Sequence, residues 1–341
     1  MRTGSKSCGS EIMKAKNRLR LFYGNPFALI SAALLCFILL AIVIIPLVSP
    51  YKYNETLKGA RNLAPFEYSA EEQADIRAGE TVFPHIFGTD ELGRDYLVRV
   101  AYAAGISIAI GLLSSLAVMM IGVVYGSVAG YFGGHADRIM MSLVDIIFSL
   151  PDLLIIIILS LLFSSITRQS RTAVPMGAGM FSILIVFSLV YWVGMARVVR
   201  GQVMSVKHRE YVQAARAMGA SAFYIIRKHI IPNCLGIIIV TTTLEIPLAI
   251  FTESFLSFLG LGVQAPMPSL GSLTYAARGS LQSFPHKLIF PSIAICLIVL
   301  AFNLLGDGLR DALDPRQTER GQSKPAVLPM LKLMRGRRLG G

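Results

Sequence analysis

The sequence predicts an all-α polytopic membrane protein with six transmembrane helices, and this prediction rests on composition, on long apolar runs and on where the charges lie. Hydrophobic residues fill 54% of the 341 positions and charged residues only 15%, whereas soluble domains carry nearer a quarter charged residues. Several apolar runs reach the length of about 18 residues that crosses the hydrocarbon core of a bilayer. Short polar segments rich in arginine and lysine separate several of these runs, and a longer acidic segment follows the first run.

The formal net charge of +12 indicates a membrane surface and not a nucleic-acid partner. The basic residues lie in short segments between apolar runs, as the positive-inside rule expects. The four cysteines, which are Cys8, Cys36, Cys234 and Cys296, form no CxxC pair. We therefore expect isolated thiols, without a disulfide framework or a metal site. The five histidines likewise lack the spacing of metal ligands.

The first predicted span covers Phe27 to Val48, after a basic segment of residues 1–26. Its apolar run exceeds the roughly 7–15 residues of a signal-peptide core, and no small-residue cleavage site follows it. We expect a retained span with a cytoplasmic N-terminus. Residues 49–96 then form an acidic extracytoplasmic segment, in which Thr89 or Asp90 can cap the helix that leads into the second span.

The remaining apolar runs predict five more spans. They cover Ile106 to Ala129, Ile139 to Ser164, Met180 to Val199, Leu235 to Leu259 and Leu288 to Leu305. Six crossings place both termini and the loop of residues 208–233 on the same basic side, which is the cytoplasm. Residues 311–341 form a basic tail that we expect to be disordered or to rest on anionic lipid.

The loop of residues 208–233 predicts a helix–turn–helix. Helical periodicity places Glu210, Ala214 and Met218 on one face. Gly219 can end this helix because glycine adopts the left-handed conformation without strain. Ser221 is a candidate N-cap for a second short helix, and Pro232 either ends that helix or opens the next one.

The same loop is rich in small residues, at Ala214, Ala215, Ala217, Gly219 and Ala220. Small side chains let another backbone approach closely. We therefore expect a partner protein to bind this loop.

Carboxylates inside the predicted spans are candidates for a polar translocation path, since a charge in a membrane is costly and usually faces a cavity or a partner. They are Asp145, Glu245 and Glu253. The alternative is hydrogen bonding between helices. We favour that structural role for Asp145, two helical turns from Arg138, and leave both roles open for Glu253. Pro151 and Pro247 can interrupt helical hydrogen bonding, which suits the wall of a cavity.

The sequence contains no catalytic motif. It lacks the G-x-x-x-x-G-K-[ST] loop that binds nucleotide phosphates, and it has no nucleophile motif. We expect no enzymatic activity, and no cofactor bound by this chain.

Four stretches in a fixed order resemble the C-type permease subunits of oligopeptide, dipeptide and nickel ABC importers. They are residues 87–95 (FGTDELGRD), the loop with Gln213-Ala214-Ala215, Gly219 and Ile231-Pro232, residues 256–262 (LSFLGLG), and residues 303–311 (NLLGDGLRD) followed by Asp314-Pro315-Arg316. This resemblance extends from the first span to Arg316. It implies a type I ABC importer transmembrane domain over residues 97–310.

The resemblance also implies that residues 208–233 are the loop that docks onto an ATPase subunit. Its matching positions are Glu210, Gln213, Ala214, Ala215, Gly219 and Pro232. Gln213 departs from the family pattern, which has a glutamate there. A contact that needs a carboxylate at this position is therefore not implied.

The implied partners are a second homologous permease, two ABC ATPase subunits that bind ATP and Mg²⁺, and an external substrate-binding lipoprotein or periplasmic protein. The implied substrate is an oligo- or dipeptide, and the implied location is a bacterial or archaeal cell membrane. The alternatives are a permease for nickel or another small solute, a proton-coupled secondary transporter with Asp145 and Glu253 as relay, and a scaffold without transport activity.

Overall fold

The computed structural model describes residues 26–169, 178–262 and 267–313, and within these ranges regular structure is helical, with a single isolated β-bridge. The helices are α2 (Pro26–Val48), α3 (Ala70–Arg77), α4 (Tyr96–Phe132), α5 (Gly134–Phe148), α6 (Asp152–Gln169), α7 (Ala178–Val190), α8 (Trp192–Val206), α9 (Glu210–Ala217), α10 (Ala222–Ile225), a π-helix (Ile226–Ile230), α11 (Ile231–Phe258), α12 (Leu270–Ala277), a short 3₁₀ turn (Arg278–Ser280) and α13 (His286–Leu313).

Five continuous helical stretches among the described residues are long and apolar enough to cross a membrane, and the number rises to six if a bent pair of helices counts as one crossing. The continuous ones are Pro26–Val48, Tyr96–Phe132, Met180–Val206, Ala222–Phe258 and His286–Leu313. The predicted third span is wrong as a single helix, since Gly134–Phe148 and Asp152–Phe163 meet at 84°. Pro151 lies at the break, where it lacks the N–H that a continuous helix needs.

The second crossing begins earlier than its apolar run, and its N-cap differs from the prediction. Asp95 caps α4 by accepting a hydrogen bond from the Val98 N–H at 2.9 Å. Asp90, a predicted cap, instead accepts hydrogen bonds from the backbone of Leu92 and Arg94 within a tight turn. Thr89, the other predicted cap, accepts a hydrogen bond from the Leu63 N–H and donates one to the Ala60 carbonyl. The cap prediction was therefore wrong, because both side chains bind the backbone of the preceding loop.

The second helix of the 208–233 loop is the beginning of the fifth span. Ser221 caps α10 as predicted, accepting a hydrogen bond from the Tyr224 N–H at 3.3 Å. The chain then continues through the π-helix into α11, so the apolar stretch Ala222–Phe258 is one continuous helix. Pro232 lies in the first turn of α11, where a missing N–H is tolerated. A displacement of the loop is therefore transmitted directly to this span.

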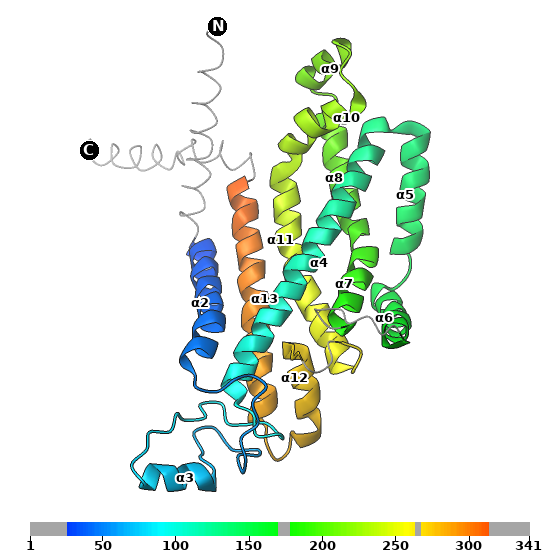
Figure 1. Cartoon of the computed structure of the whole chain (residues 1–341). Helices are drawn as coiled ribbons and strands as arrows, with labels where there is room; N and C mark the ends of the chain where they lie inside the picture. The colour runs from blue at the N-terminus through cyan, green and yellow to red at the C-terminus, as the bar shows by residue number, and fades with distance from the viewer. Residues whose placement is uncertain (1–25, 170–177, 263–266, 314–341) are drawn as a thin grey trace, which may run out of the picture.

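The two ends of the molecule carry different elements (Figure 1). Helices α9 and α10 project at one end, and α3 and α12 lie at the other. Helix α2 begins, and α13 ends, toward the end that carries α9. This arrangement is the one that six crossings require.

Small residues bring α4 and α8 together. Gly122, Gly126 and Gly130 recur at four-residue steps along α4. A Cβ atom on Gly126 would lie only 2.4 Å from the Ala196 carbonyl oxygen of α8. Helices in membranes approach closely where side chains are this small, so α4 and α8 form a tightly packed pair.

Candidate functional site

The loop around α9 and α10 is fixed to the helical body on one side and exposed on the other. Val212 and Ala215 are buried, with 1% and 3% of their surfaces exposed. They belong to one hydrophobic cluster with Val203 and Val206 of α8 and with Ile238 of α11. Ala215, one of the predicted loop residues, therefore packs its methyl group inward against the spans.

The exposed face of the loop carries large apolar side chains. Met218 is 81% exposed and Phe223 is 72% exposed, on either side of Gly219. Gly219 has φ +82° and makes the predicted left-handed turn between α9 and α10. Sequence reasoning missed Met218 and Phe223 as surface residues, although a large apolar residue on each side of a turn glycine is a usable signal. An exposed apolar surface of this kind is typical of a protein interface.

The other predicted loop residues also lie at this end of the molecule. Glu210 is the exposed first residue of α9, and Ala214 is exposed on the same helix. Gln213 donates a hydrogen bond from Nε2 to the His208 carbonyl at 3.1 Å. Pro232 is exposed in the first turn of α11. The structure thus brings these residues to one end, with Ala215 on the inner face.

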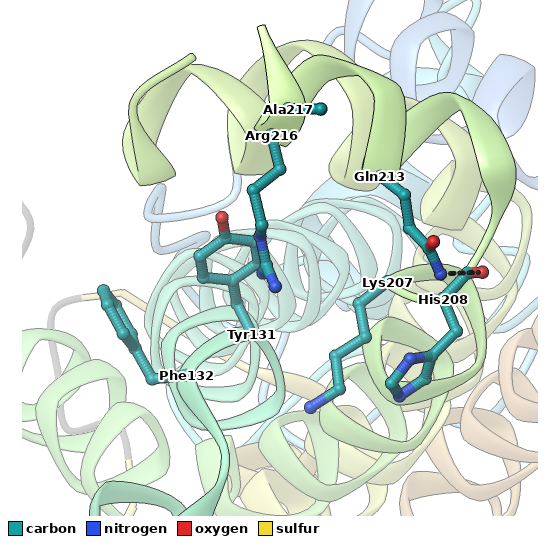
Figure 2. Close-up of a pocket in the computed structure, with 7 residues that line it drawn as sticks. All are labelled: Tyr131, Phe132, Lys207, His208, Gln213, Arg216 and Ala217. Carbon is teal, nitrogen blue, oxygen red and sulfur yellow. Dashed lines mark hydrogen bonds between the residues drawn. The ribbon is translucent and has the colours of Figure 1, made fainter. Parts of the chain in front are cut away.

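A pocket of about 500 Å³ lies beneath α9 (Figure 2). Its lining residues are Tyr131, Phe132, Lys207, His208, Gln213, Arg216 and Ala217. The Arg216 guanidinium lies 5.1 Å from the centre of the Tyr131 ring, and Lys207 donates a hydrogen bond to the Gly130 carbonyl at 2.9 Å. These contacts attach α9 and the end of α8 to the end of α4. The charged residues that line the pocket are basic.

The carboxylates of the predicted path have three different environments. The Asp145 side chain is 68% exposed and pairs with Arg197 at 2.7 Å, not with Arg138. Arg197 also stacks on the Phe148 ring, 3.9 Å from its centre. Asp145 is therefore neutralised at the surface of the chain.

Glu253 is completely buried and accepts hydrogen bonds from serines of two helices. Ser257 donates at 2.7 Å and Ser107 of α4 donates at 3.2 Å. Ser107 in turn accepts a hydrogen bond from the Leu270 N–H of α12 at 3.1 Å. This carboxylate therefore connects α4, α11 and α12.

Glu245 differs from both, because it faces a cavity of about 420 Å³. The cavity lies where α5 turns into α6, and Asp152 and Tyr191 also line it. The structure therefore places only one of the predicted path residues, Glu245, on the wall of this cavity.

Among the described residues, no group of three or more His, Cys, Asp or Glu side chains could hold a metal ion.

The helical crossings define a multi-pass membrane protein, and an exposed loop with apolar side chains lies at one end of its spans. A profile described as "Binding-protein-dependent transport system inner membrane component" matches residues 122–319, and one described as "N-terminal TM domain of oligopeptide transport permease C" matches residues 16–65. The chain belongs to this family of transport-system inner membrane components. The predicted all-α fold, the family resemblance and the permease role are confirmed.

Several curated relatives match most of the chain. The oligopeptide transport system permease protein OppC of Bacillus subtilis is 40% identical over 301 residues, covering 88% of this chain and 89% of the relative. The dipeptide transport system permease protein DppC of Bacillus subtilis is 43% identical over 293 residues, covering 86% and 82%. The glutathione transport system permease protein GsiD of Pectobacterium atrosepticum is 42% identical over 232 residues, covering 68% and 73%.

Among solved structures, a chain of the inward-facing MetNI methionine ABC transporter matches with a TM-score of 0.47 and 20% identity. The match covers 64% of this chain and 96% of that chain.

Proposed function

We propose that this chain is a permease subunit of an ATP-driven importer of peptides. The observation that carries the proposal is the α9–α10 loop, which is exposed, apolar at Met218 and Phe223, and continuous with a membrane-crossing helix. The names of the relatives, which are permeases for oligopeptides, dipeptides and glutathione, support a peptide substrate.

The proposed complex contains a second homologous permease, two ABC ATPase subunits and an external binding protein. ATP and Mg²⁺ belong to the ATPase subunits, and this chain binds no cofactor. The assignment of ATP binding to separate subunits is supported by the sequence of this chain, which lacks a phosphate-binding loop. The loop and both termini face the cytoplasm, where ATP is available.

In the proposed mechanism, the loop acts as a lever between the ATPase subunits and the spans. Val212 and Ala215 fix α9 to the end of α8, and α10 continues through the π-helix into α11. ATP binding closes the ATPase subunits and moves the loop as a rigid unit, which switches the spans between inward-open and outward-open states. The coupling energy is the difference between the contacts made in these two states.

Transport by the complete importer in proteoliposomes tests this proposal. Peptide uptake should require ATP on the side of the vesicle membrane that carries the ATPase subunits. Uptake should persist when an ionophore removes the proton gradient. Uptake that stops with the ionophore and continues without ATP would identify a proton-coupled transporter instead. Peptide uptake that survives removal of this chain from the complex would leave it as a scaffold.

A further inference from the structure

The strongest unassigned feature of the molecule is the Glu245 carboxylate. It lies within the crossing Ala222–Phe258 and lines the cavity of about 420 Å³. Within the ranges that the structure describes, no hydrogen bond or ion pair engages it, in contrast to Asp145 and Glu253. A carboxylate without a partner at membrane depth is costly. Its position on the wall of a cavity therefore points to a partner outside this chain.

The cavity wall includes a break in the helical body. Pro151 lies at this break, between α5 and α6, whereas Tyr191 lines the cavity from the continuous stretch Met180–Val206. Non-helical backbone at membrane depth is tolerated where it is buried in protein or lines a water-filled cavity. Breaks of this kind are also where secondary transporters place their binding sites. The volume falls within the range of about 300–1,000 Å³ that is usual for ligand pockets.

The charges on the cavity wall have one sign. The ionisable carboxylates there are Glu245 and Asp152, and no lysine or arginine lines it. The basic residue nearest along α8, Arg197, is engaged by Asp145 and lies over Phe148. The rest of the wall is mainly apolar, with Ile147 and Val193 among its members. The cavity therefore fits a ligand with one cationic group and an apolar body.

We propose that this cavity is a subsite for the α-ammonium group of a transported peptide, with Glu245 as its counter-charge and Asp152 beside it. The inference rests on the proposed function, since it takes the ligand to be a peptide. A free N-terminus is the cationic group that peptides of different sequence share. The subsite therefore recognises the peptide class without reading side chains.

Transport of two probes by the complete importer tests the subsite. The probes are radiolabelled trialanine and N-acetyl-trialanine, each at a concentration that saturates the binding protein. Glu245→Gln should lower trialanine uptake by about tenfold or more, since a hydrogen bond to a charged group is worth roughly 1.5–3 kcal/mol. Uptake of the acetylated probe should change by less than about twofold. Glu71→Gln, which makes the same change at an exposed carboxylate of α3 outside the cavity, should leave both rates unchanged.

A second measurement probes the cavity without delivery by a binding protein. A Cβ atom on Gly194 would lie 4.0 Å from Glu245 Oε1, so Gly194→Cys reports the local potential in a background with the native cysteines replaced by alanine. A trimethylammonium thiol reagent should react faster than a neutral reagent of similar size. Glu245→Gln should reduce this ratio by about tenfold.

The inference is overturned if Glu245→Gln slows both peptides equally and releases the second permease, because Glu245 then pairs with a cation of that subunit. It is also overturned if trialanine uptake stays unchanged, or if the ratio of reagent rates stays the same. A wild-type importer that transports neither probe, but takes up another solute, refutes the peptide substrate and hence the proposed function itself.

Discussion

His85 holds together residues 49–96, the predicted extracytoplasmic segment (the outer segment), as a cationic centre between two carboxylates. Its ring is fully buried, with Nδ1 2.8 Å from Asp95 Oδ2 and Nε2 3.0 Å from Glu72 Oε1. Only a doubly protonated imidazole can donate to both carboxylates at once. Burial of the ring favours its neutral form, but the hydrogen bonds to Asp95 and Glu72 outweigh it and raise the pKa of His85. One proton thus connects α3 to the N-cap of α4.

This centre predicts loss of stability in the outer segment as pH rises. A histidine with a raised folded-state pKa contributes its full stabilisation below its unfolded pKa of about 6.5. That contribution is lost as pH rises through the higher folded-state pKa of His85. Hydrogen exchange of the α3 amides, corrected for intrinsic rates, should show protection that falls over this interval by about 1.5–3 kcal/mol.

The variants that test this centre are His85→Gln and Glu71→Gln. The first should remove the pH dependence and lower protection at acidic pH. The second neutralises an exposed carboxylate of the same helix, away from the His85 ring, and should keep the wild-type profile. An unchanged profile in His85→Gln would contradict the assignment.

The α9–α10 loop predicts a loss of coupling when its exposed apolar side chains become polar. Met218→Ser with Phe223→Ser should weaken the ATPase subunit's attachment by about tenfold or more, because burying each side chain is worth about 1.5–3 kcal/mol. The readouts are retention of the ATPase subunit on the purified complex and ATP hydrolysis stimulated by the loaded binding protein.

The matched control is Ile76→Ser, which changes an exposed apolar residue of α3 at the opposite end of the molecule. It should leave ATPase attachment unchanged. Equal losses in the control and in the loop variant would remove the support for α9–α10 as the docking surface.

The α4–α8 pair predicts a stability difference between two glycine substitutions. Gly126→Ala places a methyl group 2.4 Å from the Ala196 carbonyl, whereas a Cβ atom on Gly201 of α8 meets nothing within 4 Å. Overpacking of this kind costs about 1–3 kcal/mol, and alanine in open space favours the helix by up to roughly 1 kcal/mol. The melting temperature of the purified importer should fall for Gly126→Ala and stay or rise for Gly201→Ala. Equal shifts would show that α4 and α8 are not tightly apposed.

We expect the two ends of the molecule to lie on opposite sides of the membrane, so that a reagent outside the cell reaches only one of them. In a background without native cysteines, Glu80→Cys lies in the outer segment and Met218→Cys in the loop at the opposite end. A membrane-impermeant maleimide should label the first in intact cells and the second only after permeabilisation. Labelling of Met218→Cys from outside would reverse the orientation and remove the cytoplasmic lever.

The linear pattern of the chain was sufficient for its five continuous apolar helices and for its turn at Gly219, whereas it predicted the bent pair Gly134–Phe148 and Asp152–Phe163 as one helix. The length of an apolar run determines whether a helix can cross a bilayer. The run that begins at Phe27 therefore predicted α2 to within a few residues, and the run that begins at Leu288 predicted the start of α13 equally closely. Gly219 was predictable because the left-handed turn depends on local conformation. The sequence alone also showed that the chain lacks the phosphate-binding loop motif of nucleotide-binding proteins.

Contacts between distant segments determined the rest. Glu253 and Glu245 are two turns apart in one helix, yet their surroundings differ. Ser107, which is 146 residues away in the sequence, donates a hydrogen bond to Glu253. Glu245 instead lines a cavity at the break between α5 and α6. Asp145 pairs with Arg197, which lies 52 residues later in the sequence, and not with Arg138, which is nearer in the sequence. Ala215 is buried because α8 and α11 cover the face of α9 on which it lies. Periodicity gives the spacing of residues along a helix, but the face that is buried and the partner of each charge depend on which other helices pack against it.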